Sequence, residues 1–243
     1  MDKIIWQYWE GPKPSFIDLC LETVSKNNED FDLRVLDDKS VFDYLPNLRK
    51  DLDSLPRIAN KVDYIRFNLL HEYGGIWLDA DVVLFQDLSR PWQTMIDFNQ
   101  SFAATSHFGP GRPSIWLLMS EPNSKITKDY LKAANALLDN FDKSKIAWSQ
   151  LGAHLLWNFT NDKNYHHFPV EDFCPVPYTK YLYYFQNIDV DKFISDDSCT
   201  FVFFNEMLNR HQRDFLAKDR DEILSQDYLI SKIIRKAIYE KKG

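Results

Sequence analysis

The sequence is poor in two residue types that mark common binding sites, glycine and cysteine. Only seven of its 243 residues are glycine, no GxGxxG motif follows the first predicted strand, and no Walker A motif occurs. Dinucleotide binding of the GxGxxG type and P-loop chemistry are therefore disfavoured. The three cysteines, Cys20, Cys174 and Cys199, lie far apart and form no CxxC pair. This disfavours a structural zinc site and a disulfide framework, and it favours a reducing compartment.

Long apolar runs and an excess of positive charge are also missing. No stretch approaches about eighteen consecutive apolar residues, and no charged-then-apolar signal sequence precedes the first predicted strand. The net charge of -7 gives no basic field of the kind that nucleic-acid-binding proteins present. We therefore expect a cytoplasmic protein that does not bind nucleic acid.

What the sequence does contain is an alternation of strand and helix patterns. Residues 3–9 are rich in Ile, Trp and Tyr and predict a buried strand; residues 15–28 predict a helix, and residues 31–36 a second strand. Asp38 is expected to cap a short helix that follows. This order predicts an α/β fold with a Rossmann-like, mostly parallel sheet flanked by helices.

The clearest helical pattern covers residues 57–73, where apolar residues step by four, three and four. Gly74 and Gly75 supply the left-handed stop, and a strand begins at once with Ile76. The second half of the chain has weaker patterns. Its expected elements are a strand at 102–105, helices at 122–141 and 148–159, a strand at 200–204 and a helix at 221–242.

Two carboxylates interrupt the apolar run that follows Gly75. Asp79 and Asp81 are two residues apart, so at strand spacing both side chains point to the same side. Two like charges that close together are unfavourable unless something compensates them. A hard divalent cation does so directly and leaves coordination positions open for phosphates. The alternative is a strand that ends in a solvated acidic turn, which is a common feature.

The helix before this strand carries a second pair of charged residues. Asp63 and Arg66 are three residues apart and therefore project as neighbours beside the apolar stripe. Because the glycine stop returns the chain directly into the acidic segment, an acid, a guanidinium and two metal-binding carboxylates can surround one crevice. The alternative is an ordinary ion pair on a helix surface, worth a few tenths of a kcal/mol.

Three segments together resemble the signature of glycosyltransferase family 32. They are Ala59 to Phe67, Tyr73 to Asp81, and the opening Lys3 to Gly11, which resembles the first strand of that family. The family includes capsular polysaccharide synthesis transferases, fungal mannosyltransferases and the glucosylating domains of clostridial toxins. The resemblance covers about the first third of the chain and is far more specific than the two aspartates alone.

The resemblance implies a GT-A fold, a nucleotide-sugar donor, a cation such as Mn²⁺ or Mg²⁺, and retention of anomeric configuration. By motif position, Trp9 stacks on the base, although the residues alone favour a core aromatic. Asp63 and Arg66 hold hydroxyls of the donor sugar, and Arg66 also faces the phosphates. Asp79 lies near the ribose or donor sugar and the metal, and Asp81 ligates the metal.

The remaining sequence matches the family less closely. A further metal ligand is expected after the late strand, where no residue matches cleanly; the candidates are Asn205, Glu206 and His211. A donor-facing loop is plausible around Gln150, Gly152 and His154. We expect one GT-A domain over residues 1–243, with a nucleotide-sugar-binding half at 1–110 and an acceptor-side half, including the C-terminal helix, at 111–243.

The predicted reaction moves a sugar, preferably a UDP-linked hexose, to a saccharide or lipid-linked saccharide in capsular or surface polysaccharide synthesis. No covalent nucleophile is evident, which favours front-face transfer. One alternative is a haloacid-dehalogenase-type phosphatase with Asp79 as the nucleophile, in which Asp196 and Asp197 form the later acidic motif. Another is a non-catalytic module that binds nucleotide sugars.

The C-terminal segment also predicts a contact with a partner. Its apolar residues fall on one side of a helix, and basic residues lie nearby, so the helix can dock on the anionic inner face of a membrane. The residues nevertheless favour a terminal helix that packs its apolar stripe on the core. The residues concerned are apolar Leu229, Ile230, Ile233, Ile234, Ala237 and Ile238, and basic Lys232, Arg235, Lys236, Lys241 and Lys242.

Overall fold

The computed structural model describes residues 3–106, 109, 111–161 and 163–240, and its chain divides into two compact units that interleave along the sequence. Neither unit begins or ends at residue 110, where the sequence predicted the boundary between the donor-binding and acceptor-side halves. The single-domain organisation stays a prediction. The first unit comprises Met1–Trp9, Phe31–Leu78 and Pro91–Phe168, and the second comprises Glu10–Asp30, Asp79–Arg90 and Pro169–Gly243.

The first unit is built on a six-stranded sheet of order β2-β1-β3-β6-β5-β7. In the described residues, β6 alone runs antiparallel to its neighbours, and the other pairings are parallel. The mostly parallel α/β sheet that the sequence predicts is therefore confirmed. The strands are β1 (Ile4–Tyr8), β2 (Asp32–Leu36), β3 (Gly75–Leu78), β5 (Phe102–Thr105), β6 (Leu117–Ser120) and β7 (His166–Phe168).

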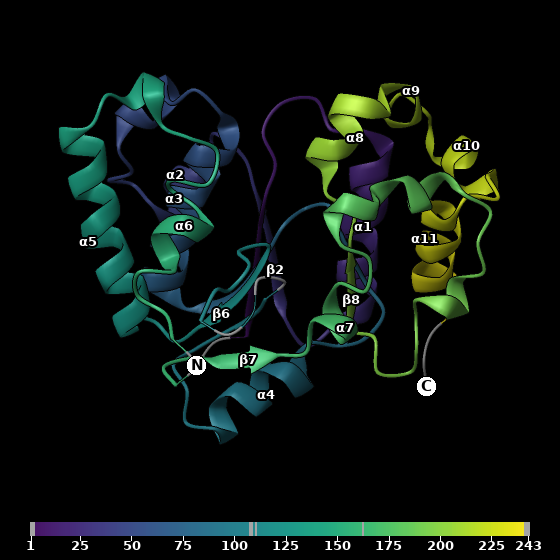
Figure 1. Ribbon diagram of the computed structural model, residues 1–243, viewed down its shortest axis with the longest axis horizontal. Coiled ribbons are helices and arrows are strands. Elements are labelled where there is room, and N and C mark those ends of the chain that lie inside the picture. The colour runs from purple at the N-terminus through teal and green to yellow at the C-terminus, as the bar shows by residue number, and fades with distance from the viewer. Residues whose placement is uncertain (1–2, 107–108, 110, 162, 241–243) are drawn as a thin grey trace. The chain divides into compact units, whose positions relative to one another are not determined.

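Helices cover both faces of this sheet (Figure 1). α3 and α5 lie side by side on one face, where Phe67 of α3 and Tyr130 of α5 stack with ring centroids 3.5 Å apart, and α4 lies on the other face. The helices are α2 (Val41–Tyr44), α3 (Ile58–Tyr73), α4 (Ser89–Asp97, which begins in the second unit), α5 (Lys125–Asn140) and α6 (Ala153–Leu156), with 3-10 helices η1 (Lys50–Ser54) and η2 (Lys143–Lys145).

Two predictions in this unit are wrong in detail. The helix expected at 148–159 shrinks to α6, because turns occupy the residues before it. Asp37, rather than Asp38, holds the start of the segment that leads into α2: its Oδ1 accepts the backbone N–H groups of Lys39 and Ser40 at 3.0 and 2.8 Å.

The glycine pair between α3 and β3 is required by close packing. Gly75 has φ +96, and a Cβ there would lie 2.6 Å from the carbonyl oxygen of Ile4 on β1. Gly74 has φ +68, and its carbonyl accepts the indole N–H of buried Trp6 at 2.9 Å. Only glycine tolerates both the left-handed backbone and the contact. The pair therefore sets where β3 begins beside β1.

The second unit is built around a two-stranded antiparallel sheet. β4 (Val82–Leu84) pairs with β8 (Thr200–Val202), and α1 and α11 pack against β4. Rings of Phe16, Tyr184, Phe203 and Phe215 form its aromatic core. The helices are α1 (Ser15–Asn27), α7 (Val170–Phe173), α8 (Asn205–His211), α9 (Arg213–Leu216), α10 (Arg220–Ser225) and α11 (Leu229–Tyr239), with 3-10 helices η3 (Tyr178–Phe185) and η4 (Val190–Lys192).

The C-terminal helix is shorter than predicted. The segment from 221 onward is not one helix, because α10 ends at Ser225 and α11 begins at Leu229. The apolar stripe of α11 is buried at 5% exposure or less, so it packs on the core, as the residues favour. Lys241 and Lys242 lie outside the described residues. None of the helices in the described chain has the length and apolar character of a membrane span.

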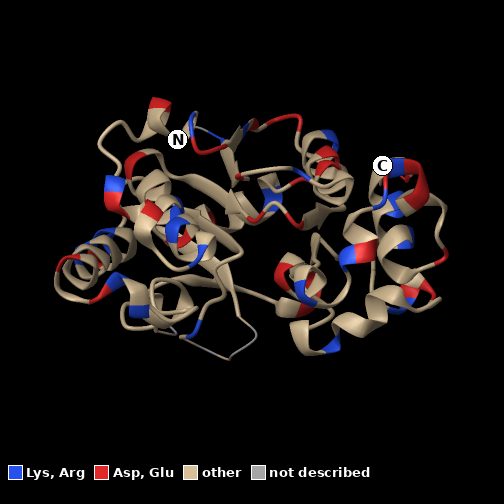
Figure 2. Cartoon of the chain, turned by 90° about the horizontal axis from the view of Figure 1, so that it is seen from above, with Lys and Arg blue, Asp and Glu red and all other residues tan. Residues whose placement is uncertain are grey.

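The basic residues of α11 are engaged within the second unit. Lys232 donates to Asn187 Oδ1 at 2.6 Å, Arg235 donates to the carbonyl of Gln226 at 2.8 Å, and Lys236 pairs with Asp191 at 3.2 Å. Acidic and basic residues are interspersed along the helices (Figure 2). The membrane contact of this helix stays a prediction.

Candidate functional site

In the first unit, α3 holds Asp63 and Arg66 as a buried pair. Each residue is only 4% exposed, and a carboxylate oxygen of Asp63 lies 3.5 Å from the guanidinium of Arg66. Arg66 also donates to the carbonyl of Ile115 at 2.6 Å and lies over the ring of Trp77 at 5.0 Å. Removing one member would leave a buried charge uncompensated, which typically costs about 3–5 kcal/mol. The alternative of an ordinary surface ion pair is therefore wrong.

A loop at residues 146–152 packs beside this pair and is fastened by side chains of α3 and α5. Asn60 donates to the carbonyls of Ala147 and Trp148 at 3.2 and 3.1 Å. The hydroxyl of Tyr130 donates to the carbonyl of Leu151. Burial raises the pKa of Tyr130 well above its usual range, and the nearby charge of Asp63 raises it further. The phenol therefore stays protonated and holds the loop as a donor.

Gly152 brings the backbone of this loop directly against the carboxylate. A Cβ at Gly152 would lie 2.7 Å from Oδ2 of Asp63 and 3.0 Å from Cδ1 of Ile115. Sequence reasoning placed Gly152 in a possible donor-facing loop but gave no partner for it. The other residues named there contribute less: Gln150 accepts the N–H of Ala147 at 3.0 Å, and exposed His154 lies against Trp157.

In the second unit, Asp79 and Asp81 occupy a turn rather than a strand. β3 ends at Leu78, β4 begins at Val82, and the N–H of Val82 donates to the carbonyl of Asp79 at 3.3 Å. The prediction that strand spacing orients the two carboxylates is therefore wrong, although both residues are half-buried. A turn frees the two side chains from strict alternation across a strand.

Asp81 is fixed by the segment that follows β8. Its carbonyl accepts the N–H of Phe203 at 3.1 Å, and its Oδ2 accepts the N–H of Asn205 at 2.6 Å. Beneath it, burial raises the pKa of the Cys20 and Cys174 thiols, and the charge of Asp81 raises it further. Both thiols are therefore protonated at neutral pH.

The three candidates for a further metal ligand are placed differently. Oδ1 of Asn205 is buried and accepts no hydrogen bond from the described residues, although its backbone contacts Asp81. Glu206 is paired with Arg210 at 2.6 Å on the surface of α8. His211 stacks on Tyr181 at the far end of α8, about 9 Å along the axis from Asn205. Asn205 is thus the candidate nearest to Asp81.

The site fits a hard cation through oxygen ligands. Carboxylate and amide oxygens are ligands that Mg²⁺ and related ions prefer; Asp81 supplies a carboxylate, and the residue whose backbone N–H binds it, Asn205, supplies an amide. Among the described residues, no group of three His, Cys, Asp or Glu side chains surrounds a common point. Two protein ligands with phosphates completing the coordination are nevertheless typical of Mg²⁺ sites.

Trp9 lies at the end of β1 in the first unit. It is half-buried, and its backbone N–H donates to the carbonyl of Leu36 at 2.9 Å. A partly exposed indole at a strand end is compatible with base stacking, and its role as the base platform stays a prediction.

The acidic residues invoked for a phosphatase lie at the wrong end of β4. The N–H of Phe85 donates to the carbonyl of Cys199 at 2.9 Å, which places Asp196 and Asp197 near the end of β4 that follows Leu84. Roughly 10 Å of strand separates that end from the Asp79 turn. The phosphatase alternative is therefore not favoured.

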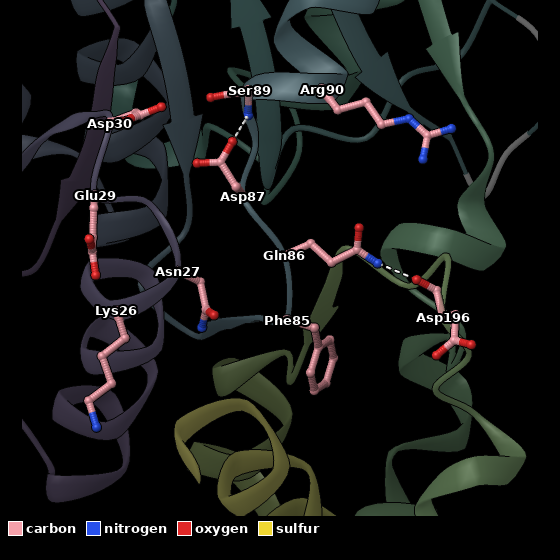
Figure 3. Close-up of a pocket in the computed structure, with 10 residues that line it drawn as sticks. All are labelled: Lys26, Asn27, Glu29, Asp30, Phe85, Gln86, Asp87, Ser89, Arg90 and Asp196. Carbon is pink, nitrogen blue, oxygen red and sulfur yellow. Dashed lines mark hydrogen bonds between the residues drawn. The ribbon is translucent and has the colours of Figure 1, made fainter. Parts of the chain in front are cut away.

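That end of β4 borders an open cavity of about 960 Å³ within the second unit. Figure 3 shows Gln86 reaching toward Asp196, whose carbonyl accepts its amide N–H. None of the residues predicted for the glycosyltransferase site lines it, although Asp196 of the phosphatase alternative does. The lining residues are Lys26, Asn27, Glu29, Asp30, Phe85, Gln86, Asp87, Ser89, Arg90 and Asp196.

Known proteins resemble this chain in both sequence and fold. Residues 1–151 match the model of a family described as capsular polysaccharide synthesis protein. O-glycosyltransferase PaGT of Phomopsis amygdali is 33% identical over 78 residues, which cover 29% of this chain and 19% of PaGT. The crystal structure of the glycosyltransferase GlyE of Streptococcus pneumoniae TIGR4 has a TM-score of 0.51 and 13% identity, covering 100% of this chain and 66% of GlyE. GlyE therefore shows a common fold, while this chain spans about a fifth of PaGT.

Proposed function

Because the chain belongs to the capsular polysaccharide synthesis protein family, we propose that it is a glycosyltransferase that moves a hexose from a UDP-sugar to a saccharide acceptor in surface polysaccharide synthesis. The sequence match to PaGT, named an O-glycosyltransferase, and the fold shared with GlyE support this class of reaction. The proposal includes dependence on Mn²⁺ or Mg²⁺ and retention of anomeric configuration.

The observation that carries the metal part of the proposal is the pairing of Asp81 with Asn205. The amide oxygen of Asn205 is buried without a donor, and it belongs to the residue whose N–H holds the Asp81 carboxylate. We assign Asp81 and Asn205 as cation ligands, with Asp79 nearby. A bound divalent cation supplies positive charge that stabilises the diphosphate as it leaves.

The remaining proposed roles concern residues that bind the donor. Asp63 accepts hydrogen bonds from hydroxyls of the donor sugar, and Arg66 donates to the sugar or the phosphates. The loop at 146–152 holds the Asp63 carboxylate in place through Gly152. Trp9 stacks on the base. In this proposal the leaving phosphate guides the acceptor hydroxyl to the same face of the sugar, since no enzyme nucleophile is assigned.

The test is release of UDP from a panel of UDP-hexoses, with GDP-hexoses as a second panel, in Mn²⁺ and in EDTA. Asp81→Asn should lower kcat/KM by about 10²-fold or more, and Asn205→Ala should raise the Mn²⁺ concentration needed for half-maximal rate. Asp43→Asn, an exposed aspartate on α2, serves as the control. Unchanged rates in EDTA and in Asp81→Asn would refute the metal site. Calorimetric binding of UDP-sugars without any turnover would favour a binding module instead.

A further inference from the structure

The 3-10 helix η3 presents an aromatic surface to solvent. We call Tyr178, Tyr181 and Leu182, with Phe204 and His211, the tyrosine platform. Tyr178 and Leu182 are 48% and 54% exposed. The ring of Tyr181 stacks on His211 with centroids 5.5 Å apart and planes at 25°. Tyr178 and Leu182 are thus large apolar side chains exposed on one short segment, and exposed apolar surface can mark a binding site.

The platform rests on a rigid base. Tyr184, on the inner side of η3, is fully buried, and its hydroxyl donates to the carbonyl of Val202 on β8 at 3.2 Å. Its ring packs edge-on against Phe201 and Phe203 at 5.7 and 5.4 Å. The outward orientation of η3 is therefore set by the core of the second unit. Aromatic rings held in this way bind ligands at little entropic cost.

The platform is continuous with the cation site proposed above. The ring of Tyr178 meets that of Phe204 edge-on at 6.1 Å. Phe204 directly precedes Asn205 and adopts a left-handed backbone with φ 50, a conformation that costs about 1–2 kcal/mol for a residue with a side chain. The N–H groups of Phe203 and Asn205, on either side of it, both bind Asp81. Two hydrogen bonds to Asp81 thus hold Phe204 in the conformation that contacts Tyr178.

We propose that the tyrosine platform binds a hexose ring of the acceptor saccharide, an inference that rests on the proposed function. Tyr178 contacts Phe204, and the next residue, Asn205, donates its N–H to the Asp81 carboxylate, so the platform adjoins the proposed cation site. The slightly positive C–H face of a hexose complements the negative face of an aromatic ring, while the phenol hydroxyls reach sugar hydroxyls.

The experiment separates acceptor binding from donor chemistry. Lactose, maltose and cellobiose are the probes, and binding in the presence of UDP and Mn²⁺ is followed by saturation-transfer NMR. Tyr178→Ala should weaken binding of the disaccharide that the wild type prefers by about tenfold, whereas Tyr178→Phe should keep most of it. Tyr239→Ala, which removes a 63% exposed tyrosine at the end of α11, is the matched control and should bind as the wild type does.

Each other outcome is decisive. The proposal is overturned if the wild type binds none of the three disaccharides, or if Tyr178→Ala binds them normally. It is also overturned if Tyr178→Ala mainly raises KM for the UDP-sugar, since the ring would then belong to the donor site. If the wild type hydrolyses no UDP-sugar, the proposed function is refuted. The saccharide-binding proposal is not refuted by that result, because saccharide binding is measured independently of turnover.

Discussion

Replacing Gly152 with alanine tests whether the Asp63 carboxylate depends on the close approach of the 146–152 loop. The new Cβ would lie 2.7 Å from Oδ2 of Asp63, while ordinary contact begins near 3.4 Å, so the carboxylate must retreat by about 0.7 Å. The contact with Ile115 involves the end of a flexible side chain and is easily relieved. Gly152 has φ -103 and ψ -128, so the substitution does not require a left-handed backbone.

The expected result has two parts. Misplacing a substrate-contacting group by this distance can lower the rate by about 10²-fold, so kcat/KM for UDP-sugar hydrolysis should fall toward that extent. Overpacking should lower the free energy of unfolding, measured in urea, by about 1–3 kcal/mol.

A double-mutant cycle with Asp63→Ala tests whether the clash with the Asp63 carboxylate causes the loss of stability in Gly152→Ala. When the Asp63 carboxylate is removed, the new methyl group no longer meets Oδ2 at 2.7 Å. In the Asp63→Ala background, Gly152→Ala should therefore lower the free energy of unfolding by less than it does in the wild type. An equal loss of stability in both backgrounds would refute the reasoning.

Two further predictions concern the first unit. Gly75→Ala should cost more than about 3 kcal/mol or abolish folding, because the methyl group meets the Ile4 carbonyl at 2.6 Å; a cooperative unfolding transition near that of the wild type would contradict this. Arg49, and then Lys143, lower the pKa of Asp51 to about 2. This pKa is below the unfolded value of about 3.9, so the stabilisation is present above that value and disappears as the pH falls toward 2. Asp51→Asn should thus cost less than about 1 kcal/mol at pH 7 and nothing below pH 2, as urea unfolding at both pH values would show.

Local patterns predicted the first third of the chain well. Apolar periodicity located β1, α1, β2 and α3 within one or two residues, and the glycine pair correctly marked the end of α3. The resemblance to capsular polysaccharide synthesis transferases, carried by the same region, is confirmed by the family match. β6 and β7 were missed because a four-residue apolar run and a short edge strand with two histidines carry no distinctive period.

What the sequence by itself determined is which residues carry chemistry: the acid and guanidinium three apart on α3, and the two aspartates after β3. Tertiary structure alone decided their surroundings. It placed Asn205 against Asp81 across 124 positions, set Gly152 against Asp63, and buried the apolar stripe of α11. The physical reason is that periodicity specifies which side of a segment is buried, whereas its partner depends on strand pairing and packing between segments far apart in the chain.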